Sequence, residues 1–151
     1  RVRYMEINTS QFGKIKVDQD KIISFKREIL GFEGYKKFTI IDNLEDEVFY
    51  WLQSVEEPEL SFMMIDPTEF VSDYKINIPG DFREQLELKT KKEMIVYTLV
   101  VIKEEEDYIS TNLKAPIIIN HKQQKGGQLI LEAEYPTRYY LMREENQEIM
   151  G

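Results

Sequence analysis

The sequence predicts an all-β, mainly antiparallel fold, in which a single domain forms an open β-barrel with two short helices. Apolar segments of strand length recur along the chain between short turn signals, which is typical of sandwiches and barrels. No long segment shows the 3.6-residue repeat of an amphipathic helix. The 151 residues are 42% hydrophobic and 12% aromatic, which is enough for one self-sufficient core.

The predicted strands follow one another closely. They cover residues 4–8, 13–17, 22–25, 38–42, 48–54, 61–66, 75–78, 94–102, 116–120 and 128–132. Polar residues at 18–20 and the Glu-Glu-Pro-Glu run at 56–59 are expected to reverse the chain. Gly126 and Gly127 are expected to supply the positive φ angles of a tight hairpin before the last strand. Sequential hairpins of this kind predict a meandering antiparallel sheet.

The longest predicted strand, at residues 94–102, is apolar on both faces. A strand of that kind needs cover on both sides, so we place it in the centre of the sheet. The charge run at residues 103–107 ends it. We expect bulky side chains to anchor the core, namely Trp51, Phe62, Ile95, Leu99 and Ile118.

The two short helices are predicted near residues 68–71 and 81–86. Asp66 fits an N-cap position, and a proline follows it at the first helical position. Asp81 has a glutamate three residues later, which is the spacing of a capping box. Two apolar side chains four residues apart in the second helix share one face, which we expect to lie on the sheet or over a barrel mouth.

The charge balance disfavours direct binding of nucleic acids. The chain has 28 acidic and 20 basic residues and a net charge of −8, so its surface repels phosphate backbones. An acidic surface suits a basic protein partner, because charge complementarity raises the association rate. The absence of cysteine fits a reducing cytosol, and no apolar run is long enough to span a membrane.

Residues for catalysis are scarce. The lone histidine, His121, follows a predicted strand among polar neighbours and is expected to be an exposed turn residue. Cysteine and histidine clusters for a metal are absent from the sequence, as is a glycine-rich phosphate loop. The acidic residues occur in runs in predicted loops, which is typical of solvated faces. We therefore expect no enzymatic activity, no cofactor and no metal.

The most informative segment is Ser-Thr-Asn-Leu-Lys-Ala-Pro-Ile-Ile-Ile-Asn at residues 110–120, a polar, irregular approach to a β-branched strand. Three other segments precede it in a fixed order. They are Leu-Gly-Phe-Glu-Gly-Tyr at 30–35, Trp-Leu-Gln-Ser-Val-Glu-Glu-Pro-Glu-Leu at 51–60 and Phe-Met-Met-Ile-Asp-Pro at 62–67. Together, in this order and spacing, they resemble the bacterial flagellar assembly factor FliW over nearly the whole chain.

The resemblance implies a cytoplasmic, non-enzymatic, β-rich protein with two alternative partners, the translational repressor CsrA and flagellin. In that scheme the free protein holds CsrA away from the flagellin message. Accumulating flagellin captures the protein and frees CsrA to repress, and secretion of flagellin makes the protein available again. We expect one domain over residues 1–151 and a monomer on its own. Residues 1–4 depart from the family, which begins near Met5.

A protein-binding surface combines exposed apolar anchors with a charged rim, and three places fit that description. They are the acidic loop at residues 56–59, the end of the first helix, and the irregular loop before residue 117. The candidate residues are Glu56, Glu57, Glu59, Phe70, Tyr74, Asn112, Lys114 and Pro116. For each of them a purely structural role, as a turn former or a core contact, stays an alternative.

Two function classes compete with this interpretation. A barrel of this size can enclose a small hydrophobic ligand, although bulky aromatic residues are expected to fill its interior. Aromatic residues can also stack on single-stranded nucleic acid, as in OB-like folds, although the sequence shows no basic groove for the backbone. A small molecule retained in native mass spectrometry would favour the first class, and retention on heparin would favour the second.

Overall fold

The computed structural model describes residues 2–42 and 48–143. Its strands are β1 (Tyr4–Thr9), β2 (Gly13–Asp18), β3 (Ile23–Arg27), β4 (Lys37–Asp42), β5 (Tyr50–Ser54), β6 (Ser61–Ile65), β7 (Met94–Lys103), β8 (Tyr108–Thr111), β9 (Ile117–Asn120), β10 (Lys125–Gln128) and β11 (Tyr139–Arg143). The helices are α1 (Gly80–Gln85) and four short 3-10 helices, η1 (Gln19–Lys21), η2 (Pro67–Glu69), η3 (Lys91–Glu93) and η4 (Glu104–Glu106).

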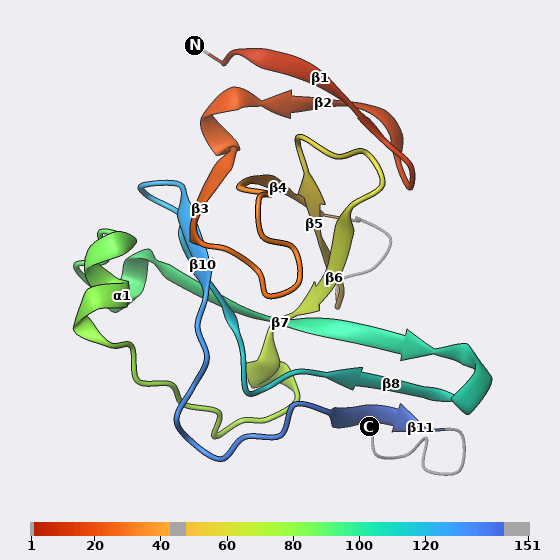
Figure 1. Cartoon of the computed structure of the whole chain (residues 1–151), viewed down its shortest axis with the longest axis vertical. Helices are drawn as coiled ribbons and strands as arrows, with labels where there is room; N and C mark the ends of the chain where they lie inside the picture. Colours follow the sequence, from red (N-terminus) through yellow and green to blue (C-terminus); the bar gives the residue numbers. More distant parts are fainter. Residues whose placement is uncertain (1, 43–47, 144–151) are drawn as a thin grey trace.

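Seven strands close into a barrel (Figure 1). Their hydrogen-bonded order is β7, β6, β5, β4, β3, β10 and β9, and β9 pairs back with β7. The neighbours are antiparallel except β3 and β10, which run parallel. The predicted β-barrel of mainly antiparallel strands is therefore confirmed, although the barrel is closed where the sequence predicted an open one.

Two pieces extend the barrel. β1 and β2 form a separate hairpin that lies over one end of the barrel (Figure 1). At the other end, β7 continues past its barrel neighbours, and its residues 100–103 pair with β8, which pairs in turn with β11. We call this three-stranded extension, formed by residues 100–103, β8 and β11, the arm. The hairpin includes Tyr4, which pairs with Asp18, so the ordered fold begins ahead of Met5.

Side chains fill the barrel interior. Phe38, Leu52, Met64 and Ile117 have no measurable solvent exposure and form one cluster with inward side chains of β3, β7 and β9. The ring of Phe38 also lies 4.9 Å, centroid to centroid, from that of Phe25. Filling by large apolar residues is what a barrel of this diameter requires.

A second core lies outside the barrel, under α1. Phe82 and Leu86 of this region are fully buried against Ile118 of β9 and Leu129, which follows β10. The expectation that these two helix side chains lie on the sheet is thus confirmed. The expected cap is wrong, because the N-cap is Pro79, and the Asp81 carboxylate instead accepts a hydrogen bond from Arg27.

Gly126 and Gly127 do not form a turn, contrary to the sequence prediction. They lie inside β10, and the chain reverses over residues 121–124, where Gln124 has a φ of 54°. A Cβ atom on Gly126 would lie 3.0 Å from the ring of Phe25, and one on Gly127 would lie 2.9 Å from Cβ of Arg27. The glycines are needed because β10 packs closely against β3.

Several predicted elements shift or change. The segment 75–78 is irregular, residues 129–132 follow β10 without being a strand, and the strands β8 and β11 were not predicted. At the first predicted helix, η2 is a single 3-10 turn in which Asp66 accepts a hydrogen bond from the Thr68 N–H, as expected of an N-cap. Three further 3-10 turns, η1, η3 and η4, were not predicted as helices.

The predicted core anchors are only partly confirmed. Ile118 is fully buried, whereas Trp51, Phe62, Ile95 and Leu99 are half-buried. Because Leu52 points into the barrel, strand alternation puts Trp51 on the outer face. There its ring packs edge-on against Phe12 of the hairpin, with centroids 5.7 Å apart. The cover predicted on both sides of residues 94–102 is also wrong at the outer end of β7, where Val101 and Ile102 are exposed.

Candidate protein-binding site

The loop at residues 56–59 joins β5 to β6, as predicted, and the buried end of β5, Gln53 and Ser54, holds it. Ser54 Oγ accepts hydrogen bonds from the main-chain N–H groups of Glu56 at 3.1 Å and Glu57 at 2.8 Å. The buried Gln53 amide extends beneath the loop, and its Nε2 donates to carbonyl oxygens of Ser54 and Leu60 at 3.0 and 3.2 Å. These contacts fix the loop before any partner arrives.

The three acidic residues of this loop have different roles. The Glu56 carboxylate accepts hydrogen bonds from the main-chain N–H groups of Lys36 and Lys37 at 3.0 and 3.2 Å, so it joins the loop to β4. Glu57 is half-buried, and its carboxylate accepts from the Glu59 N–H at 3.3 Å. Glu59 is exposed. Glu57 and Glu59 therefore present the charge of the loop, whereas Glu56 mainly holds its shape.

The turn of the hairpin lies beside this loop. The Ser10 N–H donates to the Pro58 carbonyl oxygen at 2.9 Å, and a shallow hollow between them is lined by Gln11, Glu59 and Ser61. Sequence reasoning missed this neighbourhood, because residues 10 and 58 meet only through the long-range packing of the hairpin. Trp51 was the one available signal, since a tryptophan on a strand needs cover for its ring. Phe12 of the hairpin supplies that cover.

The second predicted place is mostly buried. Tyr74 was expected to be an exposed anchor, but it is only 7% exposed, and its hydroxyl donates to the Leu113 carbonyl oxygen at 2.7 Å. Its ring packs on that of Tyr135, and burial raises the pKa of the Tyr74 phenol. Phe70 is half-buried at the end of η2. The expected exposure of Tyr74 is wrong because the 112–116 loop folds over it.

The third predicted place, residues 112–116, is enclosed by the chain itself. Asn112 Oδ1 accepts hydrogen bonds from the N–H groups of Lys114 and Ala115 at 3.0 and 3.1 Å. Lys114 Nζ donates to the Ala133 carbonyl oxygen at 2.9 Å. Pro116 is buried, although a contact role requires exposure, and its carbonyl oxygen accepts from Leu129. In Figure 1 this segment and the 56–59 loop lie at opposite ends of the barrel.

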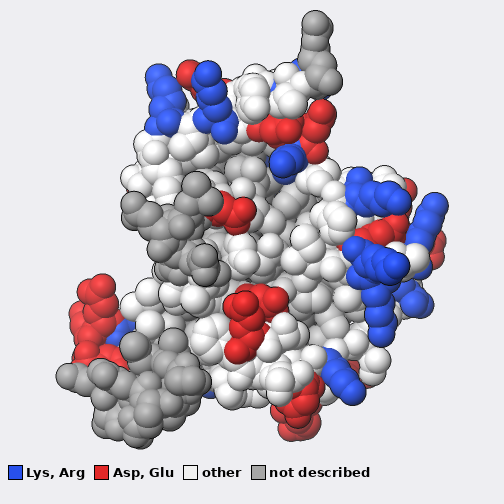
Figure 2. All heavy atoms as spheres, turned by 180° about the vertical axis from the view of Figure 1, so that it is seen from behind, with Lys and Arg blue, Asp and Glu red and all other residues white. Residues whose placement is uncertain are grey.

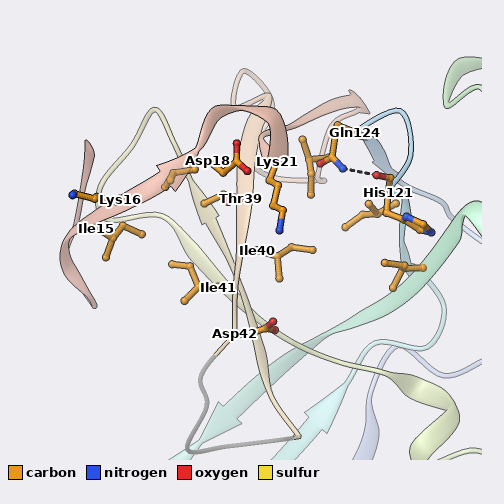
Figure 3. Close-up of a pocket in the computed structure, with 14 residues that line it drawn as sticks. Ile15, Lys16, Asp18, Lys21, Thr39, Ile40, Ile41, Asp42, His121 and Gln124 are labelled. Atoms are coloured by element: carbon orange, nitrogen blue, oxygen red, sulfur yellow. Dashed lines mark hydrogen bonds between the residues drawn. The ribbon is translucent and has the colours of Figure 1, made fainter. Parts of the chain in front are cut away.

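A groove of about 570 Å³ opens between the hairpin and the nearby mouth of the barrel (Figure 3). Its lining is mostly aliphatic and includes Ile15 of β2, Ile40 of β4 and Ile95 of β7. The Lys21 side chain extends over Ile40, and His121 lies at the rim (Figure 3). A groove with aliphatic walls and a few charged groups at its edge is suited to an apolar ligand or side chain.

Charge is unevenly spread over the surface. Seen from behind, basic side chains gather on the side of α1 and η3, at the right of Figure 2, where Arg83, Lys89, Lys91 and Lys92 are exposed. Acidic side chains mark the far end of the arm, at the lower left. Acidic and basic side chains therefore gather at different places, so a basic partner is attracted to one part of the surface and repelled by another.

The described part of the chain contains no group of three or more His, Cys, Asp or Glu side chains placed to hold a metal ion. His121 is exposed and lies in a turn, as the sequence predicted. Its Nε2 lies 3.0 Å from the Lys92 carbonyl oxygen. Of the helices in residues 2–42 and 48–143, none is long and apolar enough to cross a membrane.

Comparison with known proteins identifies the family. The family model described as FliW protein matches residues 6–141. The chain belongs to the FliW family. The flagellar assembly factor FliW of Caldicellulosiruptor saccharolyticus is 38% identical over 144 residues, which cover 95% of this chain and 94% of the relative. The FliW of Caldicellulosiruptor bescii is 40% identical over 141 residues, which cover 93% and 92%.

The fold agrees with this family. A crystal structure of the flagellar assembly factor FliW matches the chain with a TM-score of 0.85 at 32% identity, covering 93% of this chain and 99% of the other. The resemblance found in the sequence segments is therefore confirmed. FliW proteins carry the name of flagellar assembly factors, which places this chain among proteins of flagellum biogenesis.

Proposed function

We propose that this FliW-family protein is a cytoplasmic flagellar assembly factor that acts by binding other proteins, as a monomer, and not by catalysis. Membership of the family supports the flagellar role. The proposed partners are CsrA and, in an alternative complex, flagellin. By holding CsrA, the protein relieves repression of flagellin synthesis. Flagellin that accumulates then captures the protein and releases CsrA.

The exposed acidic loop carries the proposal for the CsrA contact. Ser54 and Gln53 hold this loop in one shape, so little conformational entropy is lost when a partner binds. Glu57 and Glu59 then supply negative charge at the rim of the surface formed with Ser10. Rim charges steer a basic partner toward the right orientation.

The other predicted residues have smaller proposed roles. Phe70, Asn112 and Lys114 are half-buried and can add contacts only at the edge of a partner. Tyr74 and Pro116 are buried, so we propose that they support neighbouring loops and do not touch a partner.

Calorimetric titration with purified CsrA tests the main proposal. We expect binding at low salt that weakens as salt screens the rim charges. Glu59→Lys should slow association, whereas Glu84→Lys on α1, with the same change of net charge, should not. Glu56 is left unchanged because its carboxylate holds two main-chain N–H groups. No heat of binding at low salt, with both proteins folded, would refute the CsrA role. Unchanged association of Glu59→Lys would move the contact to another surface.

Competition tests the partner switch. Purified flagellin added to the preformed complex with CsrA should release CsrA, because the proposal makes the two complexes alternatives. The released fraction is measured by size-exclusion chromatography. A stable complex of all three proteins would contradict the switch and leave the separate binding of each partner intact.

The groove at the barrel mouth favours one second candidate, the binding of a small hydrophobic ligand. The interior cluster fills the barrel itself, but the aliphatic walls around Ile40 and Ile95 stay half-exposed. Native mass spectrometry of the purified protein should then show an added mass that Ile40→Lys removes. A bare protein mass would rule this candidate out.

A further inference from the structure

The outer end of β7 exposes apolar side chains on both faces of the strand. Val101 is 48% exposed and Ile102, its neighbour, is 44% exposed. Successive strand residues point to opposite faces, so neither face of the arm is covered at this position. A single exposed apolar side chain is common, but here each of the two faces of one projecting strand end carries one.

The main chain at this end is also open along one edge. β6 pairs with β7 only at Thr98 and Leu99, and β7 then runs past it into the arm (Figure 1). The Asn112 N–H donates to the Leu99 carbonyl oxygen at 3.0 Å, so strand alternation turns the main-chain groups of residues 101 and 103 toward β8. The N–H and C=O of Ile102 therefore point to the opposite edge, where no strand of the described residues pairs with them.

Charge at the end of the arm indicates what kind of segment fits this edge. The turn after β7 consists of η4 and Asp107, and its four acidic residues are all exposed. The ion pairs found among the described residues, Arg27 with Asp81 and Lys125 with Glu87, do not involve them. A strand with lysine or arginine beside its aliphatic residues matches this turn. A second copy of the chain, also with a charge of −8, matches it poorly.

We propose that the outer end of β7 is a docking edge for an extended, basic segment of a partner protein. The segment adds to the edge at Ile102, covers Val101 and Ile102 with branched aliphatic side chains, and places its basic side chains against the acidic turn. Main-chain hydrogen bonds supply affinity in this kind of strand addition, and the side chains supply specificity. This surface goes beyond the function proposed above, which uses the 56–59 loop.

A synthetic peptide in which pairs of adjacent valines alternate with pairs of lysines, blocked at both ends, presents valine on both faces and probes the edge without reference to CsrA or flagellin. In an NMR titration the amide signals of residues 101–103 should shift, and the Ile102 amide should exchange more slowly with solvent. The same peptide with glutamate in place of lysine, and a lysine–valine peptide interrupted by proline, should each bind about tenfold more weakly. Val101→Thr with Ile102→Thr keeps the charge and the strand propensity but should weaken the lysine–valine peptide about tenfold.

The matched control is Ile130→Thr, which changes an apolar side chain of similar exposure, 50%, outside the arm. It should bind the lysine–valine peptide like the unchanged protein. No shifts at residues 101–103, equal binding of the proline-interrupted peptide, or equal losses in the control would overturn the proposal. So would sedimentation equilibrium showing a dimer that Val101→Thr with Ile102→Thr dissociates, because the occupant would then be a second copy. Failure of CsrA to bind would leave this proposal standing.

Discussion

The loops at residues 56–59 and 112–116 are both polar, irregular and adjacent to strands, yet they differ in what surrounds them. The first is held mainly by the strands it joins, through Ser54 and Gln53, and Glu59 at its tip is exposed to solvent. The second is held by distant segments, through Tyr74 and the stretch 129–136, and half of it is buried.

A binding loop and a structural loop can share the same local hydrogen bonds. Each loop has a side chain that accepts hydrogen bonds from two of its main-chain N–H groups. For the first loop this is Ser54, at the end of β5, and for the second it is Asn112. Local hydrogen bonding therefore says only that a loop is ordered. The contacts it makes with the rest of the chain determine whether its surface is free for a partner.

The largest expected effect concerns Leu113, the buried centre of the second loop. Its side chain is 1% exposed in the outer core, so Leu113→Ala should lower the free energy of unfolding by about 2–5 kcal/mol. Pro58→Ala, at an exposed position of the first loop, should change it by no more than about 0.5 kcal/mol. Urea unfolding measures both. Similar losses in the two variants would remove the distinction between the loops.

A smaller effect is expected from Tyr74→Phe, which leaves the buried Leu113 carbonyl oxygen without its donor and should cost about 1–3 kcal/mol at neutral pH. The same change should alter how the free energy of unfolding depends on pH in the alkaline range. Burial raises the pKa of Tyr74 in the folded protein above the ordinary ~10 of an unfolded chain. The contribution of the Tyr74 phenol to stability is therefore complete below pH ~10 and is lost as the pH rises through the folded pKa.

Urea unfolding between pH 9 and 12 measures this dependence. Tyr74→Phe should lose stability less steeply above pH ~10 than the unchanged protein. Some slope should remain, because burial also raises the pKa of Tyr97, to about 12. An unchanged slope would mean that the Tyr74 hydroxyl is hydrated and that the second loop is more open than its contacts indicate.

Asn112→Ala and Ser54→Ala form a matched pair. Each removes the side-chain oxygen that accepts two main-chain N–H groups, so each should cost about 1 kcal/mol of unfolding free energy. Ser54→Ala should weaken CsrA binding more than Asn112→Ala, because the first loop is the main proposed contact and Asn112 can add contacts only at the edge of a partner. Calorimetry on both variants checks this, and weaker binding in Asn112→Ala alone would exchange the roles of the two loops.

The smallest expected effect on stability is that of Glu59→Lys, which should shift the free energy of unfolding by no more than about 0.5 kcal/mol because the side chain is exposed. Its association rate with CsrA should nevertheless fall, and its dissociation rate should change little. Stopped-flow fluorescence separates the two rates. A change confined to dissociation would indicate that Glu59 lies inside the contact and not at its rim.

Much of the barrel could be predicted, because its strands are local apolar runs with turn residues between them. The turn at 56–59 and the N-cap Asp66 follow from the same local chemistry. The parallel pairing of β10 with β3 could not be predicted. Two adjacent glycines are typical of a hairpin, and only the packing of Phe25 and Arg27 shows why they stand inside a strand.

The candidate site was predicted less well, for a related reason. Glu59 is exposed because it lies at a loop tip, which a sequence can indicate. Tyr74 resembled a surface anchor beside a short helix, but residues far away in the sequence cover it. The ring of Tyr135 packs on it, and the Tyr135 hydroxyl accepts a hydrogen bond from the neighbouring Lys75 N–H. The strands β8 and β11 were missed because β8 has only four residues and β11 follows irregular chain.

The parallel pair of β3 and β10 also bears on how the molecule is made. Phe25 pairs with Gly126, so a strand synthesised early has to wait for one synthesised late. Pairings between residues so far apart in sequence slow folding, and translation adds only about 5–20 residues per second. The edge of β3 next to β10 therefore stays unpaired until β10 has been synthesised. A growing chain cannot present a finished barrel to any partner before β10 has left the ribosome.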